Sequence, residues 1–592
     1  MALEPVIEFK DFSFRYKTQN EFTLFDINLT IYKGEKVLIL GPSGSGKSTL
    51  GNCINGLIPF SYDGEIKGSC KVSGIETKEA NIFTISNRVG TVLQDSDAQF
   101  VGLSVGEDIA FSLENDAVAR AIMLEQVKRT ANIVGMQEFL EALPYSLSGG
   151  QKQKVALAGI MHNDVDTLLF DEPLAALDPA MGMTAIELID DIQKEHGKTV
   201  VIIEHRLEDV LHRHVDRIVL LNEGRIVMDT TPEKLLALDT LKQNGIREPL
   251  FIAAFRLAGV CFDPNSHFEN VVEMGFESYK DAIKASYREV PVVRGYGADG
   301  NLPTSNSDAD NSDVDNSKAG GEVIVEADHV SFAYRKGQPV LTDVSFKIRR
   351  GEKIAIVGKN GAGKSTMAKL ICGIARPTEG SIRLLGEDYK ALSIREIGRM
   401  VGYVMQNPNQ MLVKDIIIEE VRLALELNGT DEEVIKERVE KVLRMTDLYP
   451  MRNWPVGALS YGQKKRVTIA SILVLQPDVI IFDEPTAGQD YKRYTEIMTF
   501  IDDLSRDFNI TVLFITHDMH LAVEYTDRAI VFADGQLIAD DAVFKVMSNE
   551  EVIERANLKQ TSLIKLAKDC DIDPEKYLHF FIEEERRERA NG

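Results

Sequence analysis

The stretch GPSGSGKST, at residues 41–49, follows the apolar run KVLIL and opens a helical pattern. It fits the motif G-x-x-x-x-G-K-[ST], in which glycines let backbone N–H groups converge on phosphates at the start of a helix. A second copy, GKNGAGKST at 358–366, follows KIAIV and opens a similar pattern. Two matches in the same strand, loop and helix context predict two nucleotide phosphate sites on an α/β fold. The candidate phosphate-binding residues are Gly41, Pro42, Ser43, Gly44, Ser45, Gly46, Lys47, Ser48 and Thr49, and Gly358, Lys359, Asn360, Gly361, Ala362, Gly363, Lys364, Ser365 and Thr366.

Further landmarks recur in the same order along the chain. LSGGQKQK at 147–154 returns as LSYGQKKR at 459–466, and LLFDEP at 168–173 returns as IIFDEP at 480–485. IIEHR at 202–206 returns as FITHD at 514–518. Because 592 residues exceed the ~100 to 200 of one ordinary domain, the ordered repeat predicts a duplication into two tandem domains.

Composition limits the classes of partner. The formal net charge of −25 argues against a nucleic-acid partner, because binding a phosphate backbone needs a basic surface. No apolar run approaches the ~18 to 20 residues that span a bilayer, and MALEPVIEFK lacks the features of a secretory leader. We therefore expect a location in the cytosol or against the inner face of a membrane. The five cysteines lack CxxC spacing and are interpreted as buried apolar residues: Cys53, Cys70, Cys261, Cys372 and Cys570.

The repeated motifs carry the groups that phosphoryl chemistry needs. Lys47 and Lys364 are expected to reach the β and γ phosphates of a nucleotide. TLLFDE and VIIFDE are apolar runs typical of buried parallel strands, and each ends in an Asp–Glu pair where α/β sheets hold ligands. The expected Mg²⁺ ligands are Ser48, Ser365, Asp171 and Asp483, and the groups expected to polarise the attacking water are Glu172 and Glu484.

With these motifs the chain resembles two fused nucleotide-binding subunits of an ABC transporter, over about 5–240 and 323–547. The resemblance implies two tandem α/β cassettes of the P-loop NTPase class, each a RecA-like core with an antiparallel β subdomain and a helical subdomain. It also implies that each signature loop completes the ATP site of the opposite cassette, which makes an intramolecular cassette dimer. The signature residues implied to bind ATP are Ser148, Gly149, Gly150 and Gln151, and Ser460, Tyr461, Gly462 and Gln463.

The resemblance assigns roles to other positions as well. Tyr16 and Tyr334 match the aromatic residue that stacks on adenine. Gln94 and Gln406 match the glutamine that contacts Mg²⁺ and the transmembrane partner. The remaining matches are the loop that links the two sites, at Asp178 and Asp490, and the histidine that holds the γ-phosphate, at His205 and His517.

Tyr461 replaces the first glycine of the second signature loop. Since tyrosine does not freely adopt a positive φ, we expect the site that it completes to be stiffer. Both cassettes keep the acidic pair and the histidine, so our hypothesis is that both sites hydrolyse ATP, at unequal rates.

Outside the cassettes, the sequence predicts an appendage at 241–296, a flexible acidic and polar linker at 297–322, and a helical appendage at 548–592. The ending FIEEERRERANG is interpreted as a solvated helix. Three functions stay open: the motor of an importer, a twin-cassette ribosome-associated ATPase, and an ATPase that clamps DNA. The loose acidic linker and the acidic charge favour the importer.

Among importers, QDSDAQFVGLSVGEDIAFSLEN at 94–115 resembles the energy-coupling-factor ATPases. The alternative is a fused sugar-importer ATPase, whose second site commonly lacks the glutamate kept here as Glu484. The resemblance implies a transmembrane scaffold subunit bearing arginines, a small substrate-binding membrane subunit, and uptake of a micronutrient such as thiamine or its pyrimidine precursor. Acidic residues in the right segments to meet those arginines are Asp97, Glu107, Asp108, Glu419 and Glu420.

Overall fold

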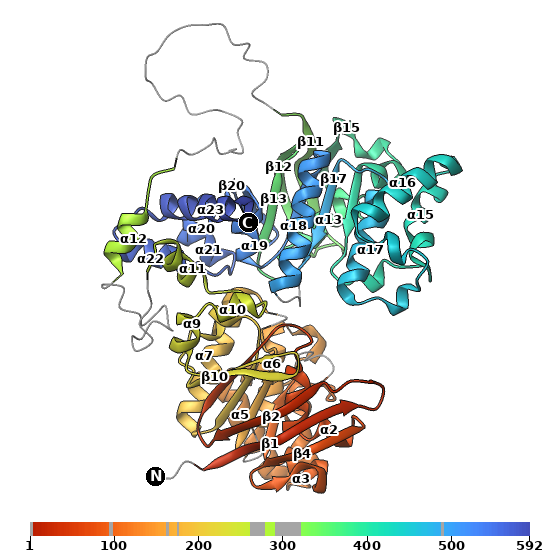
Figure 1. Ribbon diagram of the computed structural model, residues 1–592. Coiled ribbons are helices and arrows are strands. Elements are labelled where there is room, and N and C mark those ends of the chain that lie inside the picture. Colours follow the sequence, from red (N-terminus) through yellow and green to blue (C-terminus); the bar gives the residue numbers. More distant parts are fainter. Residues whose placement is uncertain are drawn as a thin grey trace. The chain divides into compact units, whose positions relative to one another are not determined.

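The computed structural model describes residues 4–93, 99–147, 149–161, 165–174, 177–260, 279–290, 321–486 and 491–591 (Figure 1). The chain forms two compact units. Unit 1 comprises Met1–Ser286 and Gly488–Lys492, and unit 2 comprises Tyr287–Ala487 and Arg493–Gly592. Each unit contains one four-stranded and one six-stranded sheet. The predicted pair of tandem α/β cassettes is therefore confirmed.

The six-stranded sheet of unit 1 has the strand order β10-β9-β3-β8-β7-β6. Its strands are parallel except β10, which pairs antiparallel with β9. Every residue of β3 and β8 is buried, which explains their continuous apolar sequences. The strands are β3 (Lys36–Leu40), β6 (Val89–Val92), β7 (Thr167–Asp171), β8 (Thr199–Ile203), β9 (Arg217–Asn222) and β10 (Arg225–Thr230).

The antiparallel sheet of unit 1 has the order β2-β1-β4-β5. Phe9, Phe12 and Phe14 of β1 are at most 1% exposed and join a core cluster that also contains Leu50 of the first helix and Ile39 of β3. Burying a side chain of this size contributes about 1.5–3 kcal/mol, so this cluster ties the two sheets together around the helix that follows the first phosphate loop. The strands are β1 (Pro5–Tyr16), β2 (Leu24–Tyr32), β4 (Gly64–Val72) and β5 (Ile75–Glu76).

The predicted helical subdomain of unit 1 is formed by α4 (Val105–Asn115), α5 (Arg120–Ile133) and α6 (Gly149–Ile160), between β6 and β7. Ser104 and Glu107 form a capping box at the start of α4, so the sequence itself specifies where that helix begins. The other helices are α1 (Lys47–Ile54), α2 (Leu57–Phe60), α3 (Ile82–Ser86), α7 (Pro179–His196), α8 (Leu207–Val210), α9 (Pro232–Ala237), α10 (Thr240–Gln243), α11 (Leu250–Leu257) and α12 (Lys280–Ser286).

Unit 2 repeats this plan, with sheet orders β12-β11-β14-β15 and β16-β17-β18-β13-β19-β20. Its strands are β11 (Val323–Phe332), β12 (Leu341–Arg349), β13 (Lys353–Gly358), β14 (Glu379–Leu384), β15 (Glu387–Asp388), β16 (Val401–Val404), β17 (Val479–Asp483), β18 (Thr511–Ile515), β19 (Arg528–Ala533) and β20 (Gln536–Ala542). Its cassette helices are α13 (Lys364–Ile371), α14 (Ile394–Met400), α15 (Ile417–Leu427), α16 (Glu432–Met445), α17 (Tyr461–Leu473), α18 (Tyr491–Phe508) and α19 (Met519–Tyr525).

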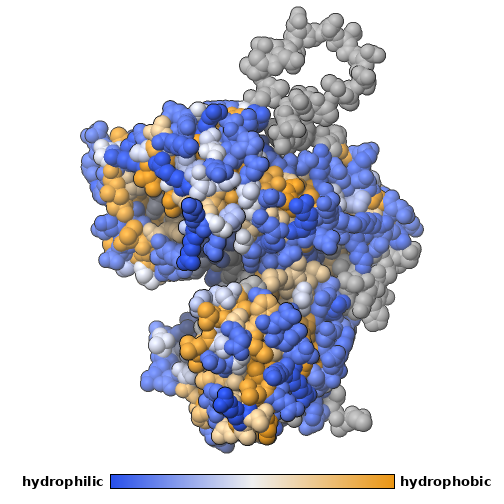
Figure 2. All heavy atoms as spheres, turned by 180° about the vertical axis from the view of Figure 1, so that it is seen from behind, coloured by the Kyte–Doolittle hydropathy of each residue, from blue (hydrophilic) through white to orange (hydrophobic). Residues whose placement is uncertain are grey.

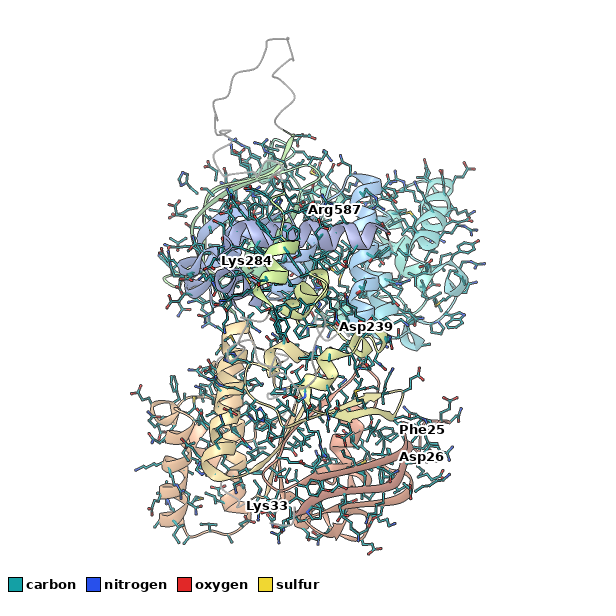
Figure 3. All side chains as sticks on the ribbon, turned by 60° about the vertical axis from the view of Figure 1, so that its left-hand side comes forward. Phe25, Asp26, Lys33, Asp239, Lys284 and Arg587 are labelled. Atoms are coloured by element: carbon teal, nitrogen blue, oxygen red, sulfur yellow. The ribbon has the colours of Figure 1, made fainter. Side chains whose placement is uncertain are left out.

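The C-terminal segment is helical, with α20 (Val543–Ser548), α21 (Glu550–Arg555), α22 (Ser562–Asp569) and α23 (Pro574–Asn591). The interpretation of its ending as a solvated helix is wrong in part. Phe581 and Ile582 of α23 are buried, because this helix packs on α20 and α22, whereas Arg587, labelled in Figure 3, is exposed and pairs with Glu584 at 2.5 Å. Among the described side chains of this ending, Arg587 and Glu588 are exposed and residues 583–586 are half-buried.

Several other expectations concern segments between or outside the cassettes. Of the predicted linker, the described residues are Gly321 and Glu322, and Glu322 pairs with Arg350 of unit 2 at 2.7 Å.

Among the described residues, no helix is long and apolar enough to cross a membrane. Figure 2 shows hydrophobic patches among the hydrophilic surface of each unit. Cys53, Cys70, Cys372 and Cys570 are buried, as predicted, and Cys261 lies outside the described residues.

Candidate functional site

The two glycine-rich loops have the same geometry in both units. Gly46 and Gly363 each have φ near +100°, a conformation that favours glycine, directly before the first residue of a helix. The Lys47 ammonium donates to the carbonyls of Gly41 and Pro42 at 2.9 Å each. The corresponding lysine of unit 2, Lys364, donates to Gly358 and Lys359 at 2.7 and 3.0 Å.

Both lysines are largely buried within their own loops, at 5% and 8% exposure. Burial of an ammonium group against loop carbonyls and a helix N-terminus concentrates positive charge at one point. Such a point is suited to the phosphates of a nucleotide.

The candidate magnesium ligands come together in each unit. The hydroxyl of Ser48 donates to Asp171 at 3.3 Å, and Ser365 hydrogen-bonds to Asp483. Burial and the neighbouring charge of Glu172 raise the pKa of Asp171 to about 6, and burial likewise raises the pKa of Asp483. A hydroxyl and a carboxylate whose negative charge is poorly stabilised fit Mg²⁺, which in nucleotide sites takes few protein ligands plus phosphate oxygens.

In unit 2, a tyrosine that the sequence analysis did not single out hydrogen-bonds to the candidate Mg²⁺ ligand Asp483. Tyr403 of β16 donates its hydroxyl to Asp483 at 2.6 Å, and its counterpart in the strand register of unit 1 is Thr91. Because the strand pairing places Tyr403 beside the end of β17, the contact depends on sheet order and carries no motif of its own. Asp483 is thereby held in one orientation.

The candidate catalytic glutamates sit at strained positions. Glu172 and Glu484 have φ of +48° and +46°, and each donates its backbone N–H to the end of the neighbouring strand, at Ile203 and Ile515. A positive φ at a residue with a side chain costs of order 1–3 kcal/mol and is concentrated at functional sites. This turn directs each glutamate away from the path of its strand, next to the histidine of the same unit.

Side chains from the signature helices, buried in unit 2 and half-buried in unit 1, reach the same turns. Lys465 of α17 is 1% exposed and donates to the backbone carbonyl of Glu484 at 3.2 Å. Burial lowers its pKa to about 8, although the charges of Glu484 and Asp483 act in the opposite direction. Its counterpart in unit 1, Gln153, donates to the carbonyl of Pro173. Each helix is thus tied to the end of the strand that carries the acidic pair.

The two candidate adenine-binding tyrosines lie beside the phosphate loops. The hydroxyl of Tyr16 is 3.1 Å from Thr49 Oγ1, and that of Tyr334 is 3.4 Å from Thr366 Oγ1. Tyr334 is 59% exposed, whereas Tyr16 is half-buried and packs edge-on against Phe14. Their placement is compatible with the predicted role, which stays a prediction.

The signature segment of unit 2 corrects the reasoning about Tyr461. Ser460 and Gln463 form a capping box, and Tyr461 is the first residue of α17, outside the set of residues with positive φ. The tyrosine hydroxyl donates to the carbonyl of Gln406 at 2.8 Å. Position 461 therefore does not require a positive φ, and the predicted stiffness of the site that Tyr461 completes, which assumed one, is wrong.

In unit 1, Gly149, Gly150 and Gln151 begin α6, while Ser148 lies outside the described residues. Gln406 is exposed, whereas Gln94 and Asp97 lie outside the described residues. Asp178 is 2% exposed and caps α7 by accepting from Met181 N at 2.9 Å. Its counterpart Asp490 is outside the described residues, and the joining of sites across the units stays a prediction.

The acidic residues expected to meet a cationic partner include two loop anchors. Asp108 accepts from the backbone N–H groups of Val101 and Gly102 at 2.8 and 3.0 Å. Glu420 is 5% exposed and accepts from Val413 and Lys414 at 2.9 and 2.6 Å. These carboxylates hold the chain's own loops, and their contact with arginines of a membrane partner stays a prediction. Among the described members of the set, Glu107, which completes the cap of α4, and Glu419 are exposed.

Glu420→Ala is expected to lower the free energy of unfolding by about 2 kcal/mol, because two backbone N–H groups lose a buried acceptor. The measurement is urea unfolding of the full chain. Glu419→Ala is the matched control and should change stability by less than about 0.5 kcal/mol, since that side chain is exposed. Equal effects of the two substitutions would contradict the anchoring role.

Comparisons with known proteins give consistent matches. Residues 24–175 and 341–487 match a family described as ABC transporter, and residues 238–295 match one described as ATP-binding cassette cobalt transporter. Two relatives bear the name "Putative ABC transporter ATP-binding protein". That of Clostridium perfringens is 51% identical over 590 residues, 100% of each chain, and that of Enterococcus faecalis is 50% identical over 588 residues, 99% of each.

Among solved structures, cbiO1 from Clostridium perfringens, described as part of the ABC transporter complex cbiONQ, is 32% identical to this chain. The match covers 40% of this chain and 95% of that one, with a TM-score of 0.37.

Proposed function

Because the chain belongs to the family of ABC transporter ATP-binding proteins, we propose that it is the motor subunit of an energy-coupling-factor importer. The chain is an ATP-hydrolysing transport ATPase with two cassettes. The observation that carries the proposal is that both units keep a full catalytic set. In each, a loop lysine, an Asp–Glu pair and a histidine gather at the ends of the parallel strands. The fused sugar-importer ATPase is disfavoured because its second site commonly lacks the glutamate present here.

The proposed chemistry follows from these groups. Lys47 and Lys364 hold the β and γ phosphates, and Glu172 and Glu484 orient and polarise the attacking water. Ser48 and Asp171, and Ser365 and Asp483, would hold Mg²⁺, which supplies charge neutralisation on the phosphates when bound. Gln94 and Gln406 are proposed to add contacts to the same ion.

The proposed transport cycle couples ATP to closure of the two cassettes. Each γ-phosphate is bound by the lysine loop of one cassette and the signature loop of the other, so ATP binding favours the closed arrangement. Hydrolysis removes those contacts and lets the cassettes separate. The membrane subunits follow the motion, as a ligand-driven shift between two states.

The proposed partners are a transmembrane scaffold subunit and a small substrate-binding membrane subunit, which place the chain at the cytoplasmic face of the cell membrane. The cargo is a micronutrient. The match of residues 238–295 to a family described as a cobalt transporter supports a transition-metal ion. The resemblance to vitamin-linked ATPases supports thiamine or its pyrimidine precursor. An ATPase does not itself contact the cargo, so its own residues do not separate the two classes.

The test is purification of the tagged chain from detergent-solubilised membranes, with copurifying proteins identified by mass spectrometry. We expect one larger helical membrane protein and one small one, both absent when the chain is untagged. Elemental analysis for cobalt and mass spectrometry for vitamins on the purified complex then assign the cargo. Recovery of ribosomes, or of no membrane protein, would refute the importer.

A further inference from the structure

The two units differ at the residue directly before the candidate catalytic histidine. Glu204 precedes His205 after β8, whereas Thr516 precedes His517 after β18. The side chains of Glu204 and Thr516 are both 0% exposed. A buried carboxylate therefore stands in unit 1 where unit 2 has a hydroxyl, one residue from a group expected to contact the γ-phosphate.

In unit 2 the histidine is bonded to the candidate catalytic base itself. His517 Nδ1 lies 2.7 Å from Glu484 Oε1, and the backbone N–H of His517 donates to the same oxygen at 3.2 Å. Thr516 donates its hydroxyl to the other carboxylate oxygen at 3.4 Å. Any change in the position of Glu484 is thus transmitted directly to the histidine ring.

In unit 1 the histidine ring forms an ion pair with a different carboxylate, which lies closer to it than the candidate base does. His205 Nδ1 lies 3.1 Å from Glu204 Oε1 and 3.8 Å from Glu172 Oε1, which is longer than a hydrogen bond. Glu204 is itself fixed, because it accepts from the backbone N–H groups of His205 at 2.8 Å, Arg206 at 3.2 Å and Leu174 at 3.3 Å. The ring of His205 is therefore oriented from a rigid part of the loop.

We propose that Glu204 is a positioning residue that holds His205 independently of Glu172, so that the two ATP sites of this chain couple histidine and base differently. The inference rests on the catalytic roles proposed above for Glu172 and His205. A carboxylate bonded to Nδ1 fixes the tautomer and orientation of an imidazole and leaves Nε2 to face a ligand. In unit 1 the residue that orients the histidine is Glu204, which belongs to no recognised motif. In unit 2 it is the candidate base, Glu484.

The charges in the loop agree with this arrangement. Burial alone would lower the pKa of His205, but the nearby negative charges of Glu204 and, to a smaller extent, Glu172 raise it to about 9. The pKa of Glu204 is lowered, because the charge of His205 and hydrogen bonds from it outweigh burial. Arg206 adds positive charge nearby, donates to Leu174 O at 3.0 Å and pairs with Asp209 at 2.7 Å. A histidine held in its charged form is suited to a phosphate.

The test measures ATP turnover after Glu204→Gln, which removes the charge but keeps one oxygen to accept the backbone N–H groups of His205 and Arg206, while the N–H of Leu174 loses its acceptor. It is made in a Glu484→Gln background, so that turnover reports the site that uses Glu172. We expect kcat to fall about 10-fold, the cost of losing one charge-assisted hydrogen bond, while KM for ATP changes less than about twofold. Glu204→Asp, which keeps the charge on a shorter side chain, should restore part of the loss.

The same Glu204→Gln substitution in a Glu172→Gln background reports the other site, and a clearly smaller fall in kcat is expected there. Equal falls in both backgrounds would show a general structural defect and overturn the proposal, as would an unchanged kcat in the Glu484→Gln background. The measurement is made on the purified chain without membrane subunits, so its outcome is distinguishable from a failure of the proposed transport function.

Discussion

Replacing both candidate bases, Glu172→Gln with Glu484→Gln, is expected to reduce ATP turnover by about 100-fold or more. General acid–base groups contribute typically about 10²–10⁴-fold, and each unit presents one such carboxylate, 16% and 14% exposed, beside its histidine. Glutamine keeps the size of the side chain and its hydrogen-bonding capacity, so folding and ATP binding should be retained. The measurement is phosphate release by the purified chain, with binding of a fluorescent ATP analogue as the control.

The single substitutions separate the two sites. If both sites hydrolyse ATP at unequal rates, each single change lowers turnover, and the residual rates differ. The different partners of the two histidines, Glu204 and Glu484, give a physical reason for such a difference. A single substitution that leaves turnover unaffected would show that its site was silent, contrary to the hypothesis that both sites hydrolyse ATP.

Arg528→Met is expected to lower the free energy of unfolding of unit 2 by about 3–5 kcal/mol. Arg528 is 6% exposed and donates to both oxygens of Asp540, at 2.5 and 2.6 Å, and to Glu352 at 3.1 Å. Methionine would leave two buried carboxylates without their cation, the situation in which breaking a buried ion pair is costly. Thermal unfolding of the full chain, with hydrogen exchange in β19 and β20, measures the loss.

The chain supplies a matched control for this prediction. Arg217, Glu35 and Asp229 repeat the same triad in unit 1, but with side-chain exposures of 21%, 22% and 33% and with ion-pair distances of 3.4 and 3.3 Å. Arg217→Met should therefore cost about 1 kcal/mol, because more exposed pairs are screened by solvent. An equal loss from both substitutions would contradict the assignment of the larger effect to burial.

Motif spacing predicted the parts of the site that depend on local backbone. Gly46 and Gly363 occupy positions that need a positive φ, and Lys47 and Lys364 follow as the first residues of helices, which fixes their direction from the sequence alone. The strands that end in Asp–Glu pairs were recognised from their apolar runs, because a parallel strand covered on both faces has no alternation.

Other predictions failed for physical reasons that sequence spacing does not carry. The stiffness ascribed to Tyr461 assumed a loop conformation, whereas that residue starts a helix. For Asp108 and Glu420 the structure adds a role that spacing did not indicate, because each carboxylate satisfies backbone N–H groups of a preceding loop; their contact with a cationic partner stays a prediction. Which loop N–H groups each carboxylate contacts depends on the path of the folded chain.

The sequence by itself therefore determined the duplication, the two α/β cassettes, the phosphate loops and the order of the catalytic motifs, because these follow from local spacing and periodicity. Only the tertiary structure decided which groups meet across strands and loops: Tyr403 with Asp483, Lys465 with Glu484, and His517, unlike His205, with the glutamate of its own Asp–Glu pair. The two halves share their motifs yet differ in these contacts, because hydrogen-bond partners are set by sheet order, burial and side-chain reach.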